Sequence, residues 1–78
     1  MKKKAKLKNP ELISLGQHIR KLRKAAGFSQ EDFANHIEMN RCYYGTIERG
    51  ETNATYLILG KIAKGLDIKH RDLIPPDA

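Results

Sequence analysis

Apolar residues recur at helical spacing along most of the chain. The first set falls on every third or fourth position: Leu12, Leu15, Ile19 and Leu22. This is the spacing of the buried face of an amphipathic helix. Asn9 can cap the start of that helix, Pro10 suits its first position, and Gly27 can end it in a left-handed conformation. The pattern predicts a helix over about residues 10–26.

Two shorter helices are predicted next, joined by a tight turn. Ser29 opens a helix over about residues 29–37, with Asp32 at capping-box spacing, and Asn40 can cap a helix over about 40–49 that stops at Gly50. The residues expected to face inward are Phe33, Ala34, Ile37, Tyr44 and Ile47. A helix pair at this spacing is the unit that places one helix in the DNA major groove, so sequence-specific DNA binding is the leading functional hypothesis.

A fourth apolar stripe begins after Thr55, which can cap a helix. Its members are Tyr56, Leu59, Ile62, Ala63 and Leu66. Residues 69–73 predict a last short helical turn, and no segment has the alternating pattern of a strand. We therefore expect an all-α fold over residues 9–74, a compact bundle of about five short helices with a central helix-turn-helix. Residues 75–78 would form a short C-terminal tail.

The formal net charge of +6 is concentrated near one end of the chain. Five of the fifteen basic residues are lysines within residues 2–8, where there are no acidic residues; the rest of the chain has ten basic and nine acidic residues. Because residues 1–8 have little to bury, we expect them to form a disordered basic tail. The predicted domain is nearly neutral, so DNA binding must be argued from where its charges lie.

The composition argues against several other classes of protein. A 78-residue chain suffices for one small domain without a deep pocket, and it has no nucleophile–base pair or phosphate loop, so we expect no enzyme. The histidines are widely spaced and do not pair with Cys42 at zinc-binding spacing, so no metal or other cofactor is expected. No apolar run is long enough to cross a membrane, and a single cysteine suits a reducing cytoplasm.

Several motifs mark the predicted helices. They are Ile19-Arg20-Lys21-Leu22-Arg23 before Gly27, Ser29-Gln30-Glu31, Ile47-Glu48-Arg49-Gly50-Glu51, and Leu59 with Ile62-Ala63-Lys64 and Leu66. Together they resemble the lambda-repressor-like (Cro/XRE-type) helix-turn-helix family, over the stretch from Leu15 to Ile74. The resemblance implies a transcriptional regulator that binds double-stranded DNA. Asn40-Arg41-Cys42-Tyr43 is also similar to the start of the recognition helix in restriction–modification controller proteins, and the lysine-rich tail to the basic arm of some phage repressors.

Two features depart from the family pattern. The family often has glycine in the turn where Glu38 stands, so we expect a positive φ at Glu38. The fourth predicted helix contains Gly60 and Gly65, each of which costs about 1 kcal/mol relative to alanine. Either close helix packing or an early helix end would explain these two glycines.

The residues expected to read bases lie near the start of the recognition helix, on the face away from its buried residues. They are Arg41, Cys42, Tyr43 and Thr46. Arg41 suits a bidentate contact to guanine, and Tyr43 can stack or touch a thymine methyl group. Thr46 can hydrogen-bond a base or a phosphate, and Gly45 leaves room for close approach to the DNA backbone. The alternative is that these side chains form an ordinary solvated face.

Phosphate contacts are expected from donors at helix starts and in loops. The candidates flank the two helices of the motif: Gln30, Asn40, Arg49, Thr52 and Asn53. Capping is expected to be the main role of Asn40. The family resemblance further implies a structural ion pair between Arg23 and Glu48, which would fix the angle between their helices. Two unrelated surface charges are the alternative.

Leu57 and Ile58 lie off the predicted inward stripe of their helix and are expected to be exposed. We interpret them as a homodimer interface, which would place two recognition helices one DNA turn, about 34 Å, apart on an inverted-repeat operator. Isolated exposed hydrophobic residues are the alternative. A second functional hypothesis is an antitoxin-like interaction module that holds a protein partner here and autoregulates. The sequence leaves open activation or repression, and a restriction–modification controller or a phage-type regulator.

Overall fold

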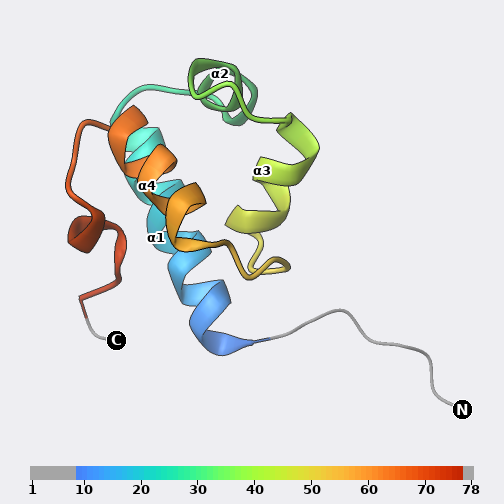
Figure 1. The fold of residues 1–78 in the computed structure, drawn as a ribbon, viewed down its shortest axis with the longest axis vertical. Helices are drawn as coiled ribbons and strands as arrows, with labels where there is room; N and C mark the ends of the chain where they lie inside the picture. Colours follow the sequence, from blue (N-terminus) through green and yellow to red (C-terminus); the bar gives the residue numbers. More distant parts are fainter. Residues whose placement is uncertain (1–8, 77–78) are drawn as a thin grey trace, which may run out of the picture.

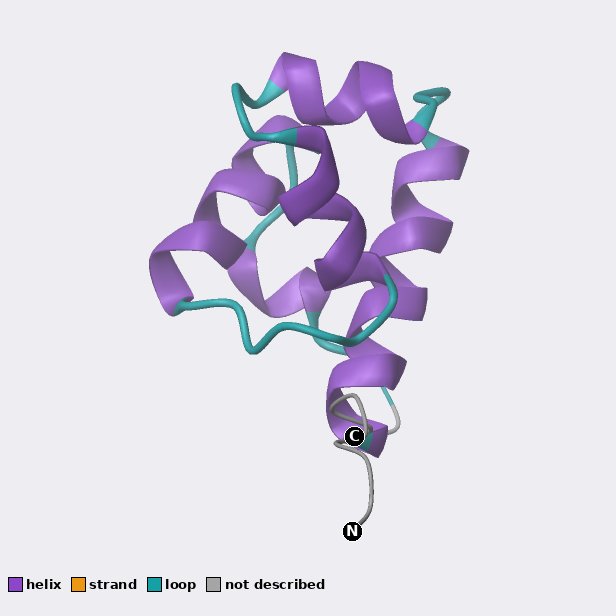
Figure 2. Cartoon of the chain, turned by 90° about the vertical axis from the view of Figure 1, so that its right-hand side faces the viewer, coloured by secondary structure: helices purple, strands orange, loops and turns teal. Residues whose placement is uncertain are grey.

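The computed structural model describes residues 9–76 and contains helices and loops but no strand in that range (Figure 2). Its elements are α1 (Pro10–Ala25), α2 (Gln30–His36), α3 (Arg41–Glu48), α4 (Tyr56–Gly65) and the 3-10 helix η1 (His70–Leu73). The all-α fold is confirmed, with four α-helices and, in place of a fifth, a single 3-10 turn. The predicted basic tail, residues 1–8, and the last two residues of the C-terminal tail lie outside the described residues.

The helix-turn-helix unit stands at one side of the molecule. In Figure 1, α1 and α4 lie between η1 on the left and α3 on the right, while α2 lies at the top. α3 packs against both α1 and α2, and η1 packs against α1 and α4. α3 is therefore supported by two other helices.

Side-chain caps begin each of the four α-helices as the sequence predicts. The backbone N–H of Glu11 donates to Asn9 Oδ1 at 2.8 Å, and equivalent bonds start α2 at Ser29, α3 at Asn40 and α4 at Thr55. These bonds satisfy backbone donors that have no partner within the helix. Gly27 adopts φ +88° after α1, and Glu38 adopts φ +56° in the turn between α2 and α3, as expected. The boundaries of the motif are thus fixed by local chemistry.

The core is formed where the helices converge. Its buried apolar residues are Ile19, Phe33, Ala34, Ile37, Tyr44, Ile47, Ile62, Ala63 and Leu73. All five inward residues predicted for α2 and α3 are among them. Leu15, Leu22 and Leu59 are partly buried against this cluster. Burial of one face of α3 determines which of its other side chains point outward.

The prediction of which side of α4 is buried is wrong in the first turn of the helix. Tyr56, expected to be buried, is 70% exposed, and its ring stacks on His70 of η1 with centroids 4.0 Å apart. Ile58, expected to be exposed, is partly buried against the core. Ile58 shares a helix face with the fully buried Ile62 four residues later, whereas the ring of Tyr56 lies against η1.

Close packing explains the two glycines of α4. A Cβ atom at Gly65 would lie 2.3 Å from Ile37 Cγ2, and one at Gly60 would lie 2.7 Å from His70 Cε1. A third glycine is still more constrained by backbone atoms. A Cβ atom at Gly16 would lie 2.4 Å from the carbonyl oxygen of Glu48, so α1 and α3 cross almost in backbone contact. The position of the recognition helix on α1 therefore depends on Gly16.

Candidate nucleic-acid interface

The outward face of α3 lies beside the start of α2. Arg41, Cys42 and Tyr43 are exposed in the first turn of α3, while Tyr44 and Ile47 are buried on its other face. A hollow of about 360 Å³ opens between the two helices, lined by Gln30, Arg41, Cys42, Gly45, Thr46 and Arg49. Three of the four predicted base-reading residues and two of the five predicted phosphate-binding residues thus line one surface.

Two arginines bring positive charge to this hollow, and each is paired with an acidic residue. Arg41 Nη1 donates to Glu31 Oε1 at 3.2 Å, and Arg49 Nε donates to Glu51 Oε2 at the same distance. The side chains of Arg41 and Glu31 are 59% and 62% exposed. Both arginines keep further N–H donors, because a guanidinium carries five.

Thr46 is less available for base reading than the sequence pattern predicts, because its hydroxyl is already hydrogen-bonded within the protein. Its hydroxyl donates to the carbonyl oxygen of Tyr43 at 2.6 Å and lies 2.6 Å from the Thr52 hydroxyl. A hydroxyl has one proton, so Thr52 is the donor of the second bond. Thr46 keeps an acceptor lone pair and its methyl group for DNA. Thr52 is held against α3 in the same way.

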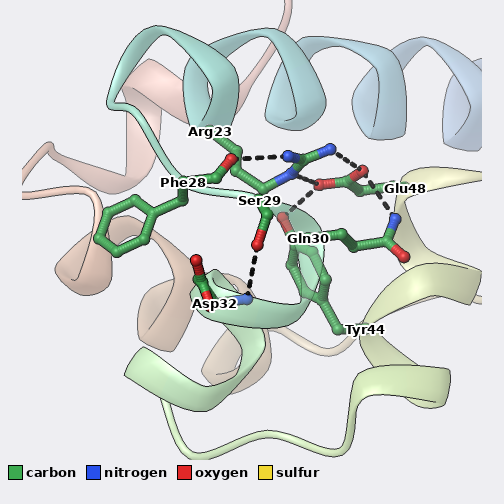
Figure 3. A network of polar contacts seen from close by, with 7 residues as sticks. All are labelled: Arg23, Phe28, Ser29, Gln30, Asp32, Tyr44 and Glu48. Carbon is green, nitrogen blue, oxygen red and sulfur yellow. Dashed lines mark hydrogen bonds and ion pairs between the residues drawn. The ribbon is translucent and has the colours of Figure 1, made fainter.

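Gln30 takes part in the buried network beneath the hollow (Figure 3). Its Nε2 donates to Glu48 Oε1 at 3.1 Å. The same carboxylate accepts from Arg23 Nε at 2.7 Å, from Arg23 Nη2 at 3.1 Å, and from the Tyr44 hydroxyl. Arg23 also donates from Nη1 to the carbonyl oxygen of Phe28 at 2.8 Å. The ion pair expected between Arg23 and Glu48 is present, and it joins α1, α2 and α3.

Burial and hydrogen bonding in this network shift the pKa values of Glu48 and Tyr44 in opposite directions. Burial alone would raise the pKa of Glu48, but hydrogen bonds from Arg23, Tyr44 and Gln30 outweigh it and hold that pKa below its ordinary value of 4.5. Burial, and then the hydrogen bond to Glu48, raise the pKa of Tyr44 far above its ordinary value. Tyr44 is therefore a neutral donor and Glu48 a charged acceptor at neutral pH.

Gly45 does not lie open to the DNA backbone as expected. It is buried, and a Cβ atom there would lie 3.1 Å from Arg49 Nη1 and 3.3 Å from Gln30 Oε1. The two long side chains cover it because they reach across the middle of α3. Asn40 caps α3 as expected, with its Oδ1 accepting from the Tyr43 N–H at 2.9 Å, and Asn53 is exposed in the loop after α3.

The two residues predicted to form the dimer interface differ in exposure in the structure. Leu57 is 81% exposed on α4, whereas Ile58 is turned toward the core. Tyr56 and Ile74 are also exposed, which the apolar pattern of the sequence does not predict. No spacing rule identifies Ile74, because it follows η1 in an extended conformation.

Sequence reasoning also missed Glu31 and the role of Tyr44 as a polar partner. Glu31 contacts Arg41 ten positions away, and Tyr44 counts as apolar in a periodicity pattern. Across residues 9–76, no three His, Cys, Asp or Glu side chains gather as metal ligands would. No helix in this range has the length and apolar character needed to span a bilayer.

The start of α3 is exposed, α3 packs against α2, and the buried Arg23–Glu48 pair fixes α3 on α1. This arrangement is that of a DNA-binding protein of the helix-turn-helix class. Comparison with known families agrees, since the helix-turn-helix family HTH_3 matches residues 19–73. The chain belongs to this family. Control protein C.MunI of Mycoplasma sp is 42% identical over 62 residues, which cover 78% of this chain and 84% of that protein.

Solved structures show the same likeness. The restriction-modification controller protein C.AhdI from Aeromonas hydrophila has a TM-score of 0.82 and 39% identity, covering 85% of this chain and 100% of that one. The controller protein C.Esp1396I, solved as a tetramer with its natural 35 base-pair operator, has a TM-score of 0.76 and 32% identity, covering 85% and 87%. The resemblance to the helix-turn-helix family and the likeness to restriction–modification controller proteins are confirmed, and the chain is a DNA-binding transcriptional regulator of this family. The antitoxin-like alternative is not favoured.

Proposed function

We propose that this protein is a homodimeric, sequence-specific regulator that binds an inverted-repeat operator with α3 in the major groove. The observation that carries the proposal is the exposed run Arg41-Cys42-Tyr43 at the start of α3, on the opposite face from buried Tyr44 and Ile47. Side chains at the N-terminal end of a recognition helix are those that reach base edges. The protein is proposed to act in the cytoplasm without catalysing a reaction.

Within this proposal, Arg41 makes the leading base contact, through donors that Glu31 leaves free. Cys42 and Tyr43 contact neighbouring bases, Cys42 at close range and Tyr43 by stacking or through a thymine methyl group. Thr46 contributes its methyl group or an acceptor lone pair, because its proton is used within the protein. These assignments follow from which groups remain available on the exposed face.

Phosphate contacts are proposed for the donors around the hollow. Arg49 and the Asn40 amide stand at the two ends of α3, and Asn53 lies in the loop beyond. Gln30 is at the first position of α2 and has one amide proton left after its bond to Glu48. Thr52 contributes only its free lone pairs to DNA or to bridging water, because its proton is used by Thr46. It therefore acts mainly by holding the loop against α3.

The dimer is proposed to form through the exposed apolar residues Tyr56 and Leu57 of α4 and Ile74 after η1, with Ile58 supporting α4 from the core. Two-fold pairing of α4 would present two recognition helices about 34 Å apart. The relative named as the restriction-modification controller protein C.AhdI supports the narrower proposal that this chain is such a controller. Residues 9–74 are proposed as the DNA-binding domain, with residues 1–8 as a basic arm and 75–78 as a short tail.

Fluorescence anisotropy with two labelled duplexes tests this function. One duplex carries the DNA upstream of the protein's own gene, and the other carries the same bases in scrambled order. The proposal predicts tighter binding to the natural sequence at physiological salt, with two protomers bound per site. Equal affinity for both duplexes, falling steeply with salt, would mean only backbone binding and would contradict specific recognition of this DNA.

A further inference from the structure

An acidic side chain stands on the surface that faces a polyanion. Glu31 lies in the first turn of α2, and its carboxylate contacts Arg41, the leading base-reading candidate, at 3.2 Å. A carboxylate close to DNA phosphates is repelled by them and lowers the affinity for DNA. The presence of Glu31 on this surface therefore needs an explanation. The helix dipole of α2 accounts for an acidic residue in this turn, but Asp32 satisfies the dipole equally and makes no hydrogen bond or ion pair with α3 among the described residues.

We propose that Glu31 is a specificity-determining residue, which holds Arg41 for a base edge and keeps it from binding phosphate. This inference rests on the proposed role of Arg41 in base reading. Glu31 occupies one N–H of the guanidinium, and the remaining donors include pairs that can bind guanine O6 and N7 together. The negative charge beside Arg41 weakens its attraction to phosphate more than its hydrogen bonds to a neutral base.

α2, which carries Glu31, and α3, which carries Arg41, are held in a fixed relative position. The rings of Phe33 on α2 and Tyr44 on α3 pack with centroids 5.4 Å apart, and Gln30 donates to Glu48 across the same pair of helices. The Glu31–Arg41 contact is therefore made between two helices whose relative position is fixed. In the free protein the pair is open to water and contributes little to stability. When DNA excludes that water, the same contact is less screened and orients Arg41 more strongly.

Three variants separate positioning from charge, and each is measured on the specific duplex and on a scrambled duplex across a salt series. Glu31→Gln should raise affinity for scrambled DNA about fivefold near physiological salt and steepen the salt slope by about 0.9, since Arg41 gains a phosphate contact. Glu31→Asp keeps the charge but withdraws the carboxylate. Both variants should lower the ratio of specific to scrambled affinity by about five- to tenfold, within the range expected for one bidentate contact.

Asp32→Asn is the matched control, because it removes the same charge from the same exposed turn. It should raise both affinities together and leave their ratio within about twofold. Equal ratios for Glu31→Gln and Asp32→Asn would overturn the inference, as would an unchanged ratio for Glu31→Asp.

Arg41→Ala separates failure of this inference from failure of the proposed function. If Arg41→Ala lowers the ratio while the Glu31 variants leave it unchanged, base reading by Arg41 stands and the role of Glu31 is wrong. If Arg41→Ala itself leaves the ratio unchanged, the proposed role of Arg41 is wrong, and the role of Glu31 is wrong with it. In Arg41→Ala, Glu31→Gln should no longer lower the ratio, because its partner is absent.

Discussion

Arg23 at the end of α1 and Glu48 at the end of α3 form a bidentate ion pair in which each residue is only 6% exposed. The carboxylate also accepts bonds from Tyr44 and Gln30, and no described side-chain polar atom buried in the structure lacks a partner. A buried ion pair is weak evidence for stability but a strong geometric constraint, because moving either helix would leave a buried charge without its partner. The pair therefore sets how α3 is presented.

Removing the Tyr44 hydroxyl should weaken the fold. Tyr44→Phe leaves the buried carboxylate with one donor fewer and should lower the free energy of unfolding by about 1–3 kcal/mol. Urea unfolding followed by circular dichroism measures the change. Tyr43→Phe is the control: its ring is exposed on the same helix, and it should change stability by less than about 0.5 kcal/mol. Equal losses in the two variants would contradict the role of the network.

Stability should fall in acid because of Glu48. Its pKa in the folded protein lies below the ordinary value of 4.5, so the stabilisation is fully present above that value. It is lost as the pH falls below 4.5 and through the lower folded pKa. Urea midpoints measured from about pH 7 to about pH 3 report this loss. Tyr44→Phe removes a bond that lowers the pKa, so its acid loss should be smaller; parallel curves would show that Glu48 is not the group responsible.

Gly16 should tolerate no side chain. Gly16→Ala would force a Cβ atom against the backbone carbonyl oxygens of Glu48 and Ile47, and the helices must separate to accept it. We expect a loss of about 1–3 kcal/mol in the free energy of unfolding, together with weaker DNA binding as α3 shifts. Gln17→Ala, at an exposed position of the same helix, should leave both properties nearly unchanged. A stable Gly16→Ala variant with normal binding would contradict the crossing geometry.

Leu57 should control assembly without controlling the fold. Leu57→Glu places a charge at an 81% exposed position, so the helix content and melting temperature of the protomer should change little. At a two-fold interface the two introduced charges face an apolar surface, and the dimer should dissociate at micromolar concentration. Sedimentation equilibrium gives the mass. Lys61→Gln, exposed on the same helix, lowers the charge by the same one unit and is the control; an unchanged dimer mass for Leu57→Glu would remove this residue from the interface.

The sequence predicts well what depends on neighbouring residues. Asn9, Ser29, Asn40 and Thr55 act as caps because the bond each makes lies within three residues of it. The family resemblance adds the positive φ of Glu38. These local features place the helix boundaries, and with them the exposed start of α3.

The sequence fails where the partner is distant in the chain. Tyr56 follows the helical stripe but stacks on His70, fourteen positions later, and Gln30 reaches a carboxylate eighteen positions away. Thr46 looks free until Thr52 is seen to donate to it. Periodicity describes one helix at a time, so it cannot show which polar groups are already used in tertiary contacts. The choice of which exposed groups remain available for DNA requires the structure.

Selection of bound sites from random-sequence duplexes, carried out in parallel with the wild-type protein and Arg41→Ala, tests most directly the claim that α3 reads bases from the start of the helix. The wild-type protein should enrich an inverted repeat with half-sites about one helical turn apart. Arg41→Ala should enrich the same repeat with its preference lost at one symmetric pair of positions. No enriched sequence for the wild-type protein, or identical enriched sequences for both proteins, would contradict the account.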